Sequence, residues 1–340
     1  MLPANKKIWR FCRTAGIINF FFLQPFFMNA QSVTNRIINP EKYYTEICKL
    51  LNKHYYYKDS LDLLAHTEKY KATFLKAGSD DSCYRVLYKM LNTLKGGHTG
   101  IVTESVLKKI QFPTKMIFSV GKLLENNVGY LKIPFCMAEQ QLTIQYVDSL
   151  LNIIRKLDEN YLKGWIIDLR DNGGGNSAPM ITGLAPFFNN GDLCYSIDRD
   201  GKRITDRMKN GVFEQVKKNK IIFSFNPVHK VILKNNNNPV AVLVNSHTAS
   251  AAERTAICLK GLANSKFFGE KTAGLTTATK AINLSDGALL YILNSVTMDM
   301  TGKIYSSEII PHFLIDEDFL FKNSSDIVLE AAIKWIAEKL

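Results

Sequence analysis

The sequence lacks the residue spacings that metal and nucleotide sites require. Its six cysteines are widely spaced, with no CxxC pair and no tight cluster of histidine and cysteine. The glycine run in GGGNSA (173–178) lacks the following Lys-Ser/Thr pair of a phosphate loop and the full spacing of a dinucleotide fingerprint. We therefore expect neither a metal ion nor another cofactor.

A basic stripe interleaved with aromatic residues is also missing, although the formal net charge is +12. Lys6, Lys7, Arg10 and Arg13 lie in a first stretch that has no acidic residue, and removing them leaves a net charge of +8. The other cations are scattered. This distribution argues against nucleic acid as a partner and favours a solvated basic face.

Long hydrophobic runs are confined to the N-terminus, which is typical of an export signal. The basic segment KKIWRFCR is followed by the apolar AGIINFFFLQPFF and by small residues in MNA. This apolar run is shorter than the roughly 18 residues of a membrane-spanning helix. We therefore predict a signal peptide over residues 1–30, an exported (periplasmic or extracellular) mature chain, and no stable membrane span after cleavage. An uncleaved anchor is the alternative. Five cysteines then remain, and their spacing specifies no disulfide.

The whole chain is 46% hydrophobic and 22% charged, which is typical of a globular protein. The part after the predicted signal peptide is long enough for one large domain with an appendage, or for two domains. Residues 40–94 have helical periodicity, which should end at Gly96-Gly97 because glycine terminates helices. We predict a helical domain over 31–97 and a catalytic core over 98–340.

Short apolar runs within the core predict strands that feed into helices. Residues 165–169 and 239–245 read as buried strands, and each is followed by a loop and a helical segment. Residues 128–135 and GALLYILNSVTMDM also predict strands, whereas 142–157 and the C-terminal segment predict helices. Two strand–loop–helix units favour a layered α/β core.

The segment NSHTASAAER (245–254) places Ser250 at the start of one of these helices. Ser250 and Glu253 fit a capping box, in which each side chain satisfies the other's backbone donor. The same position suits a nucleophile, because the amide of Ala251 at the helix start would face a tetrahedral oxyanion. Both interpretations stay open on this segment alone.

The loop DNGGGN (171–176) follows the first buried strand. Three glycines permit unusual backbone dihedrals and the close approach of a ligand, so Gly174 is our candidate for a second oxyanion donor. A plain turn is the alternative. Asp168 and Arg170, which flank the end of the strand, are predicted to form a structural ion pair.

A serine nucleophile needs a base, and histidine titrates close to neutral pH. His98 is our candidate, because GGHTG (96–100) places it between a helix end and an expected strand. His247, three residues before Ser250, is a weaker candidate. For both, an ordinary surface or core histidine is the alternative.

Four segments together resemble the C-terminal-processing (tail-specific) serine peptidases in order and spacing: GGHTG, GWIIDLRDNGGGN, PVAVLVNSHTASAAE and FFGEKTAGLTTATKAINLSDGALL. That family also includes the tricorn protease core and the repeats of interphotoreceptor retinoid-binding protein. The resemblance runs from about His98 to Pro311. It implies an α/β fold, a crotonase- and Clp-protease-like ββα superhelix after a small helical domain. It further implies Ser250 as nucleophile, with Ala251 and a glycine of 173–175 as the oxyanion hole.

Departures from the family pattern indicate which branch the chain resembles. Only about thirty residues separate His98 from VGYLKIPF, too few for the PDZ domain that many members insert there. The PDZ-bearing branch uses a lysine base twenty-five residues after the serine, where this chain has Leu275. The chain therefore resembles the PDZ-less, tricorn-like branch, in which a histidine of the GHT segment, here His98, is the base.

The third catalytic group stays open. Glu253 lies one helical turn from Ser250, and many family members have a glutamate there. The tricorn branch uses a glutamate near the end of the core; Glu308 is close to it, although the register points to Tyr305. His312 stands where the family usually has aspartate.

We predict an exported serine peptidase that hydrolyses peptides or unfolded protein chains through an acyl-enzyme at Ser250, with His98 as general base. A non-catalytic ligand- or peptide-binding relative is the main alternative, because a fold does not fix a function. An esterase or amidase with the same groups is a third possibility. The sequence specifies no oligomeric state.

Overall fold

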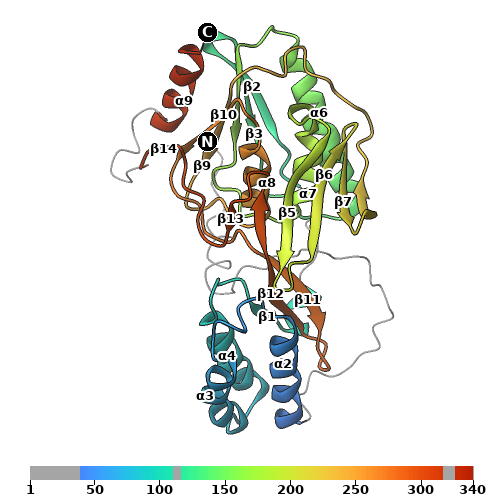
Figure 1. The fold of residues 1–340 in the computed structure, drawn as a ribbon, viewed down its shortest axis with the longest axis vertical. Coiled ribbons are helices and arrows are strands. Elements are labelled where there is room, and N and C mark those ends of the chain that lie inside the picture. Colours follow the sequence, from blue (N-terminus) through green and yellow to red (C-terminus); the bar gives the residue numbers. More distant parts are fainter. Residues whose placement is uncertain (1–38, 110–115, 317–325, 340) are drawn as a thin grey trace. The chain divides into compact units, whose positions relative to one another are not determined.

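The computed structural model describes residues 39–109, 116–316 and 326–339 (Figure 1). The expected signal peptide over residues 1–30 lies outside these residues. Contacts divide the chain into two units: Met1–Gln111 with Ala278–Ser295, and Phe112–Thr277 with Val296–Leu340. Each unit is described by itself.

The first unit is built on helices, as the periodicity of residues 40–94 predicts. Asn39, Asp62 and Ser79 each cap a helix with a side-chain oxygen. Buried residues of the helices, among them Phe74 and Leu87, pack with strand residues into one core. The elements are α2 (Pro40–His54), α3 (Leu63–Leu75), α4 (Asp80–Asn92), β1 (Gly100–Val102), α5 (Glu104–Lys109), β11 (Ala278–Asn283) and the first part of β12 (Leu289–Asp299). Both β1 and β11 pair antiparallel with β12.

The second unit contains a mostly parallel sheet in the order β14-β10-β9-β4-β3-β2, in which only the β2–β3 pair is antiparallel among the described strands. Strands β5 to β8 pair antiparallel in chain order, and the end of β12 pairs with β13. The elements are β2 (Val120–Leu124), η1 (Glu125–Asn127), β3 (Val128–Lys132), α6 (Gln140–Asp158), β4 (Gly164–Asp168), α7 (Ser177–Gly183), η2 (Ala185–Phe187), β5 (Gly191–Asp198), β6 (Arg203–Lys209), β7 (Val212–Lys217), β8 (Lys220–Phe225), β9 (Val240–Val244), α8 (Ala251–Lys260), β10 (Ser265–Gly269), β13 (Ile304–Tyr305), β14 (Phe313–Leu314) and α9 (Ile327–Ala337).

Strands β4 and β9 are buried along their whole length, which explains why both read as short apolar runs in the sequence, although β4 ends at the ion-paired Asp168. Helix α9 covers one face of this sheet, where Val328, Ala332 and Ile336 pack against residues of β4, β9 and β10. Helix α6 packs on β2 and β3, and Figure 1 shows it on the other side of the sheet from α9. Strand β4 leads through a loop into α7, and β9 leads through a turn into α8, so the predicted strand–loop–helix units are confirmed.

An ion-pair network fixes the start of α9 to the end of β4. The Arg170 guanidinium donates to both carboxylate oxygens of Asp168 and also of Asp326, with distances from 2.7 to 3.1 Å. Although burial opposes it, hydrogen bonds from Arg170 hold the pKa of Asp168 below its ordinary value. The predicted structural pair between Asp168 and Arg170 is confirmed, and its second carboxylate, Asp326, caps α9.

The unit boundaries differ from the domains that the sequence suggested. His98, β1 and residues 278–295 group with the helices, whereas the predicted core began at residue 98. The domain boundaries drawn from the sequence stay a prediction. None of the helices in the described parts of the chain is long and apolar enough to cross a membrane.

Candidate active site

The candidate site is built from two loops at one edge of the second unit's sheet. Strands β4 and β9 are adjacent and parallel, so their carboxyl ends meet at the same edge. Ligand sites in open α/β sheets lie outside such ends. The glycine loop after β4 and the serine turn after β9 are therefore brought together by the sheet itself.

Ser250 occupies a strained backbone conformation between β9 and α8. Its dihedrals are φ 57° and ψ −114°, in a region where a residue with a Cβ is rarely found. The side chain is 2% exposed, and its Oγ has no hydrogen-bond partner among the described residues. Backbone strain of this kind is often found at functional sites. In α/β-hydrolases, the nucleophilic serine lies in a sharp turn between a strand and a helix.

Glu253 holds this turn through its carboxylate. Ser250 and Glu253 occupy the two positions of a capping box, and the Ser250 amide donates to Glu253 Oε2 at 2.8 Å. The Thr272 hydroxyl and the Gly274 amide donate to Oε1 at 2.5 and 2.9 Å. The glutamate half of the capping box is formed while the serine oxygen is left unbonded, so these contacts make Glu253 an anchor of the turn. Its catalytic role stays a prediction.

Burial raises the pKa of the Glu253 carboxyl from 4.5 to about 7, although hydrogen bonds from Thr272 and from backbone amides oppose the shift. The folded chain thus binds this proton more tightly than the unfolded chain does. The resulting stabilisation is complete below pH 4.5 and is lost as the pH rises through 7.

We expect the unfolding free energy of the wild-type chain to fall by about 3 kcal/mol, relative to Glu253→Gln, between pH 4.5 and 7.5. Urea unfolding of both proteins across this range measures the difference. Subtracting the unfolding free energy of the glutamine variant at each pH removes the contribution of every other titrating group. The difference in unfolding free energy between the two proteins could instead stay constant with pH, or grow in favour of the wild type at high pH. Either result would show that the hydrogen-bond donors keep the Glu253 carboxylate ionised.

The glycine loop lies directly against the serine turn. Gly174 has φ +108°, and a Cβ added to it would lie 2.8 Å from the Ala249 oxygen, 2.9 Å from Ser250 Cβ and 3.1 Å from the Ala251 nitrogen. Only a residue without a side chain allows this approach. The structure thus brings Gly174, Ser250 and Ala251 together.

The two candidate oxyanion amides differ in their present partners. Ala251 opens α8, where the first amides have no acceptor within the helix. The Gly174 amide instead donates to Asn172 Oδ1 at 2.9 Å. Gly174 would have to exchange this acceptor for an oxyanion, and its role stays a prediction.

Asn172 is a positioning residue that the sequence reasoning missed. Its side chain is 1% exposed, accepts from the Gly174 amide and donates to the Ile133 oxygen at 2.9 Å. Its backbone oxygen accepts from the Ala249 amide at 2.9 Å, which ties the glycine loop to the serine turn. The signal was available, because asparagine commonly bonds the backbone amide two residues further on.

His98 belongs to the first unit, where its side chain is buried in the turn between α4 and β1. The helix ends at Asn92, and Gly96 and Gly97 follow with φ of 89° and 60°, so the expected glycine stop lies a few residues beyond the helix end. Ser250 belongs to the other unit. The pairing of His98 with Ser250 stays a prediction.

Each of the other candidate residues from the sequence has different neighbours in the structure. His247 is exposed, with Nδ1 3.3 Å from Asp171 Oδ1. Glu308 is exposed and lies against Gly274. Tyr305 donates to Asp299 Oδ2 at 2.8 Å, and His312 Nδ1 accepts the Phe267 amide at 2.9 Å. Of these groups, only Glu308 lies beside Gly274, whose amide donates to Glu253.

The strain at Ser250 predicts an effect on stability. Glycine adopts this conformation readily, whereas alanine keeps the Cβ. We expect Ser250→Gly to be about 1 kcal/mol more stable than Ser250→Ala, while both lack the hydroxyl. Urea unfolding of the two variants tests this; equal stabilities, or a less stable glycine variant, would mean that the turn is unstrained.

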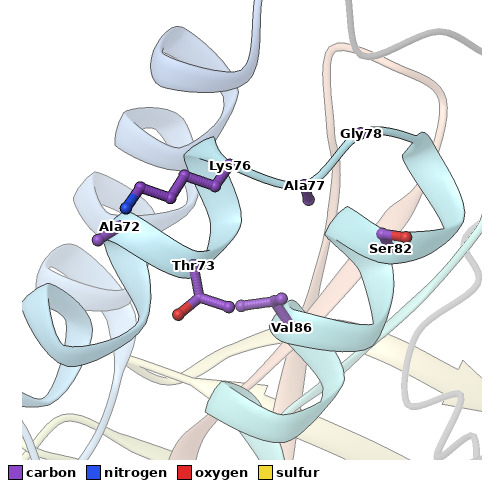
Figure 2. Close-up of a pocket in the computed structure, with 7 residues that line it drawn as sticks. All are labelled: Ala72, Thr73, Lys76, Ala77, Gly78, Ser82 and Val86. Carbon is purple, nitrogen blue, oxygen red and sulfur yellow. The ribbon is translucent and has the colours of Figure 1, made fainter.

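Other features of the described residues do not resemble an active site. The pocket in Figure 2 lies at the turn between α3 and α4, where small side chains such as Ala72 and Thr73 line it beside Lys76. No histidine or carboxylate is among its lining residues. In the described part of the chain, no three His, Cys, Asp or Glu side chains are grouped to hold a metal ion.

Two known proteins are similar to this chain in sequence. The chain is 28% identical over 302 residues to the nisin-resistance protein of Lactococcus lactis subsp. lactis, covering 89% of this chain and 88% of that protein. It is 29% identical over 182 residues to the carboxy-terminal processing protease CtpA of Bacillus subtilis (strain 168), covering 54% of this chain but 33% of that protein.

Solved structures show the same fold. A lipoprotein from Streptococcus agalactiae aligns with a TM-score of 0.69 at 24% identity, covering 92% of this chain and 100% of that one. The photosystem II D1 C-terminal processing protease aligns with a TM-score of 0.55 at 14% identity, covering 82% and 94%. The predicted α/β fold class with a small N-terminal helical region is confirmed.

The family model described as "Peptidase family S41" matches residues 127–315, more than half of the chain and the whole of both site loops. This family and the processing protease of Bacillus subtilis support a serine peptidase. The chain belongs to peptidase family S41.

Proposed function

We propose that this chain is a serine peptidase whose nucleophile is Ser250. The observation that carries the proposal is the strained, buried Ser250 with an unbonded hydroxyl, set against a glycine loop. Family membership implies peptide substrates. The hydroxyl attacks the peptide carbonyl carbon, and the amides of Ala251 and Gly174 stabilise the developing oxyanion.

His98 is proposed as the general base, which makes this chain a member of the PDZ-less branch. The imidazole takes the Ser250 proton during attack and returns it to the leaving amine; water then hydrolyses the acyl-enzyme by the same path. Leu275, at the position of the lysine base in the PDZ-bearing branch, supports a base from elsewhere. Glu253 or Glu308 is the proposed third group.

Export is part of the same proposal. The N-terminal sequence reads as a signal peptide, with an uncleaved anchor as the alternative. Substrates would then be peptides or unfolded chains outside the cytoplasm. The nisin-resistance protein matches almost the full length of this chain, so we propose that a peptide such as nisin is a substrate worth testing first.

A fluorophosphonate probe tests the enzyme directly, because it labels activated serines. We expect labelling of the purified wild-type chain at Ser250, and cleavage of nisin or of an unfolded protein detected by mass spectrometry. Labelling without peptide cleavage but with ester cleavage would favour the esterase alternative. If no probe concentration labels Ser250, a non-catalytic binding protein is the better interpretation.

A further inference from the structure

Two buried cysteines face each other where α8 packs on β5. Cys258 on α8 and Cys194 on β5 are 1% and 0% exposed, and their sulfur atoms are 3.5 Å apart. They are 64 residues apart in the sequence, which gave no sign of the pairing. Cys194, Cys258 and Ser250 all belong to the second unit.

A buried ion pair fixes the register between the two elements. Arg254 lies one turn before Cys258 on α8, and its Nε donates to Asp206 Oδ2 at 2.6 Å. Asp206 is the cross-strand partner of Cys194, whose Sγ lies 3.7 Å from the same Oδ2. Sliding of the helix along the strand would separate these two charges inside the protein. An unpaired buried charge is costly, so the pair holds the helix in its position along the strand. The two sulfur atoms are thus held opposite each other.

We propose that Cys194 and Cys258 are a disulfide site that links the helix bearing Ser250 to β5. A disulfide needs an S–S distance of about 2.04 Å, so the two sulfur atoms must approach by about 1.5 Å. Rotation about the Cα–Cβ bond of either cysteine moves its sulfur without moving the backbone. Side-chain rotation is the movement by which the proposed bond would close the 3.5 Å gap between the sulfur atoms.

The chemistry requires an oxidant of the disulfide class, such as glutathione disulfide or a thiol–disulfide oxidoreductase. The two protein thiols lose two electrons and two protons; the oxidant's S–S bond accepts them and becomes two thiols. The thiolate is the attacking species. The Cys194 thiol and burial raise the pKa of Cys258 well above its ordinary value in the folded chain. The bond accordingly forms during folding, before the sulfurs are buried, and folding then shields it from reductants.

The site has a direct test in the full-length chain. The chain is unfolded, refolded in a glutathione/glutathione-disulfide buffer or in reductant alone, and alkylated after denaturation. Non-reducing peptide mapping of the oxidised sample should yield one cross-linked peptide pair containing Cys194 and Cys258. Alkylation of both cysteines in the oxidised sample, or their pairing with other cysteines, overturns the proposal.

Thermal unfolding separates a bond from simple packing. Cys194→Ser, Cys258→Ser and the double variant should each lower the oxidised midpoint by about 10 °C, because each removes the same cross-link. The wild type and Cys136→Ser, whose cysteine is equally buried, should each have a lower midpoint when refolded in reductant than when refolded in the glutathione buffer, whereas the other three variants should show no such difference. Losses that add in the double variant, with no reductant effect on the wild type, contradict a bond.

Discussion

Ser250→Ala is expected to reduce peptide hydrolysis about a millionfold, the loss measured when a serine peptidase is deprived of its nucleophile. Ser250 has φ 57°, and its amide donates to Glu253 Oε2 at 2.8 Å, so the backbone of the turn is held without the serine hydroxyl. Alanine keeps the backbone contacts and removes only the hydroxyl. Initial rates on a cleavable peptide, with active-site titration of the wild type, measure the change.

Ser246→Ala is the matched control for that experiment. Ser246 lies in the same turn after β9 but is exposed, and its amide rather than its hydroxyl is bonded, to Glu270 at 3.0 Å. It should retain activity within a few-fold. A Ser250→Ala protein that is folded by thermal unfolding and still hydrolyses peptide at more than a hundredth of the wild-type rate would remove Ser250 from the mechanism.

Much of the second unit's sheet follows from sequence because its strands are buried on both faces. Trp165 to Leu169, interrupted only by Asp168, and Val240 to Val244 read as apolar runs, and both are strands or strand ends in the structure. Each run leads through a loop into a helix, so the meeting of the two loops at one sheet edge followed from the parallel topology. Local pattern and global arrangement agree there.

The antiparallel strands β5 to β8 did not follow from sequence. Strand β6 is mostly polar, and the apolar residues of β8 are exposed or only partly buried, so no regular hydrophobic alternation marks either strand. The contact between Cys194 and Cys258 requires β5, so it could not be predicted from the sequence for the same reason.

The geometry of the nucleophile was also beyond the sequence. A capping-box pattern at Ser250 predicts two reciprocal hydrogen bonds, and the structure forms the glutamate one while Ser250 Oγ stays unbonded among the described residues. The backbone strain at Ser250 favours the nucleophile over a plain cap, and the turn that bears this residue contacts Asn172, Gly174 and Thr272 from distant segments. Such tertiary determinants leave no local pattern.

Removing the proposed general base, His98, should have the second large effect on peptide hydrolysis. We expect His98→Ala to lower peptide hydrolysis about as much as Ser250→Ala, because in a serine peptidase the nucleophile and its base fail as a unit. The double variant should then be no worse than either single variant. His247→Ala is the control: its imidazole is exposed and paired with Asp171, although it lies three residues from Ser250.

His98 is buried, so a loss of activity in His98→Ala has two physical causes to separate. A missing base leaves the nucleophile intact but unactivated, and free imidazole in the buffer should then restore part of the rate in proportion to its concentration. Distorted packing leaves nothing for imidazole to replace, and it would also lower the thermal midpoint. Near-full activity of His98→Ala, or a loss that imidazole leaves unchanged in a destabilised protein, would transfer the base to another residue. His247 would be the first to test, because it is carried by the same turn as the serine.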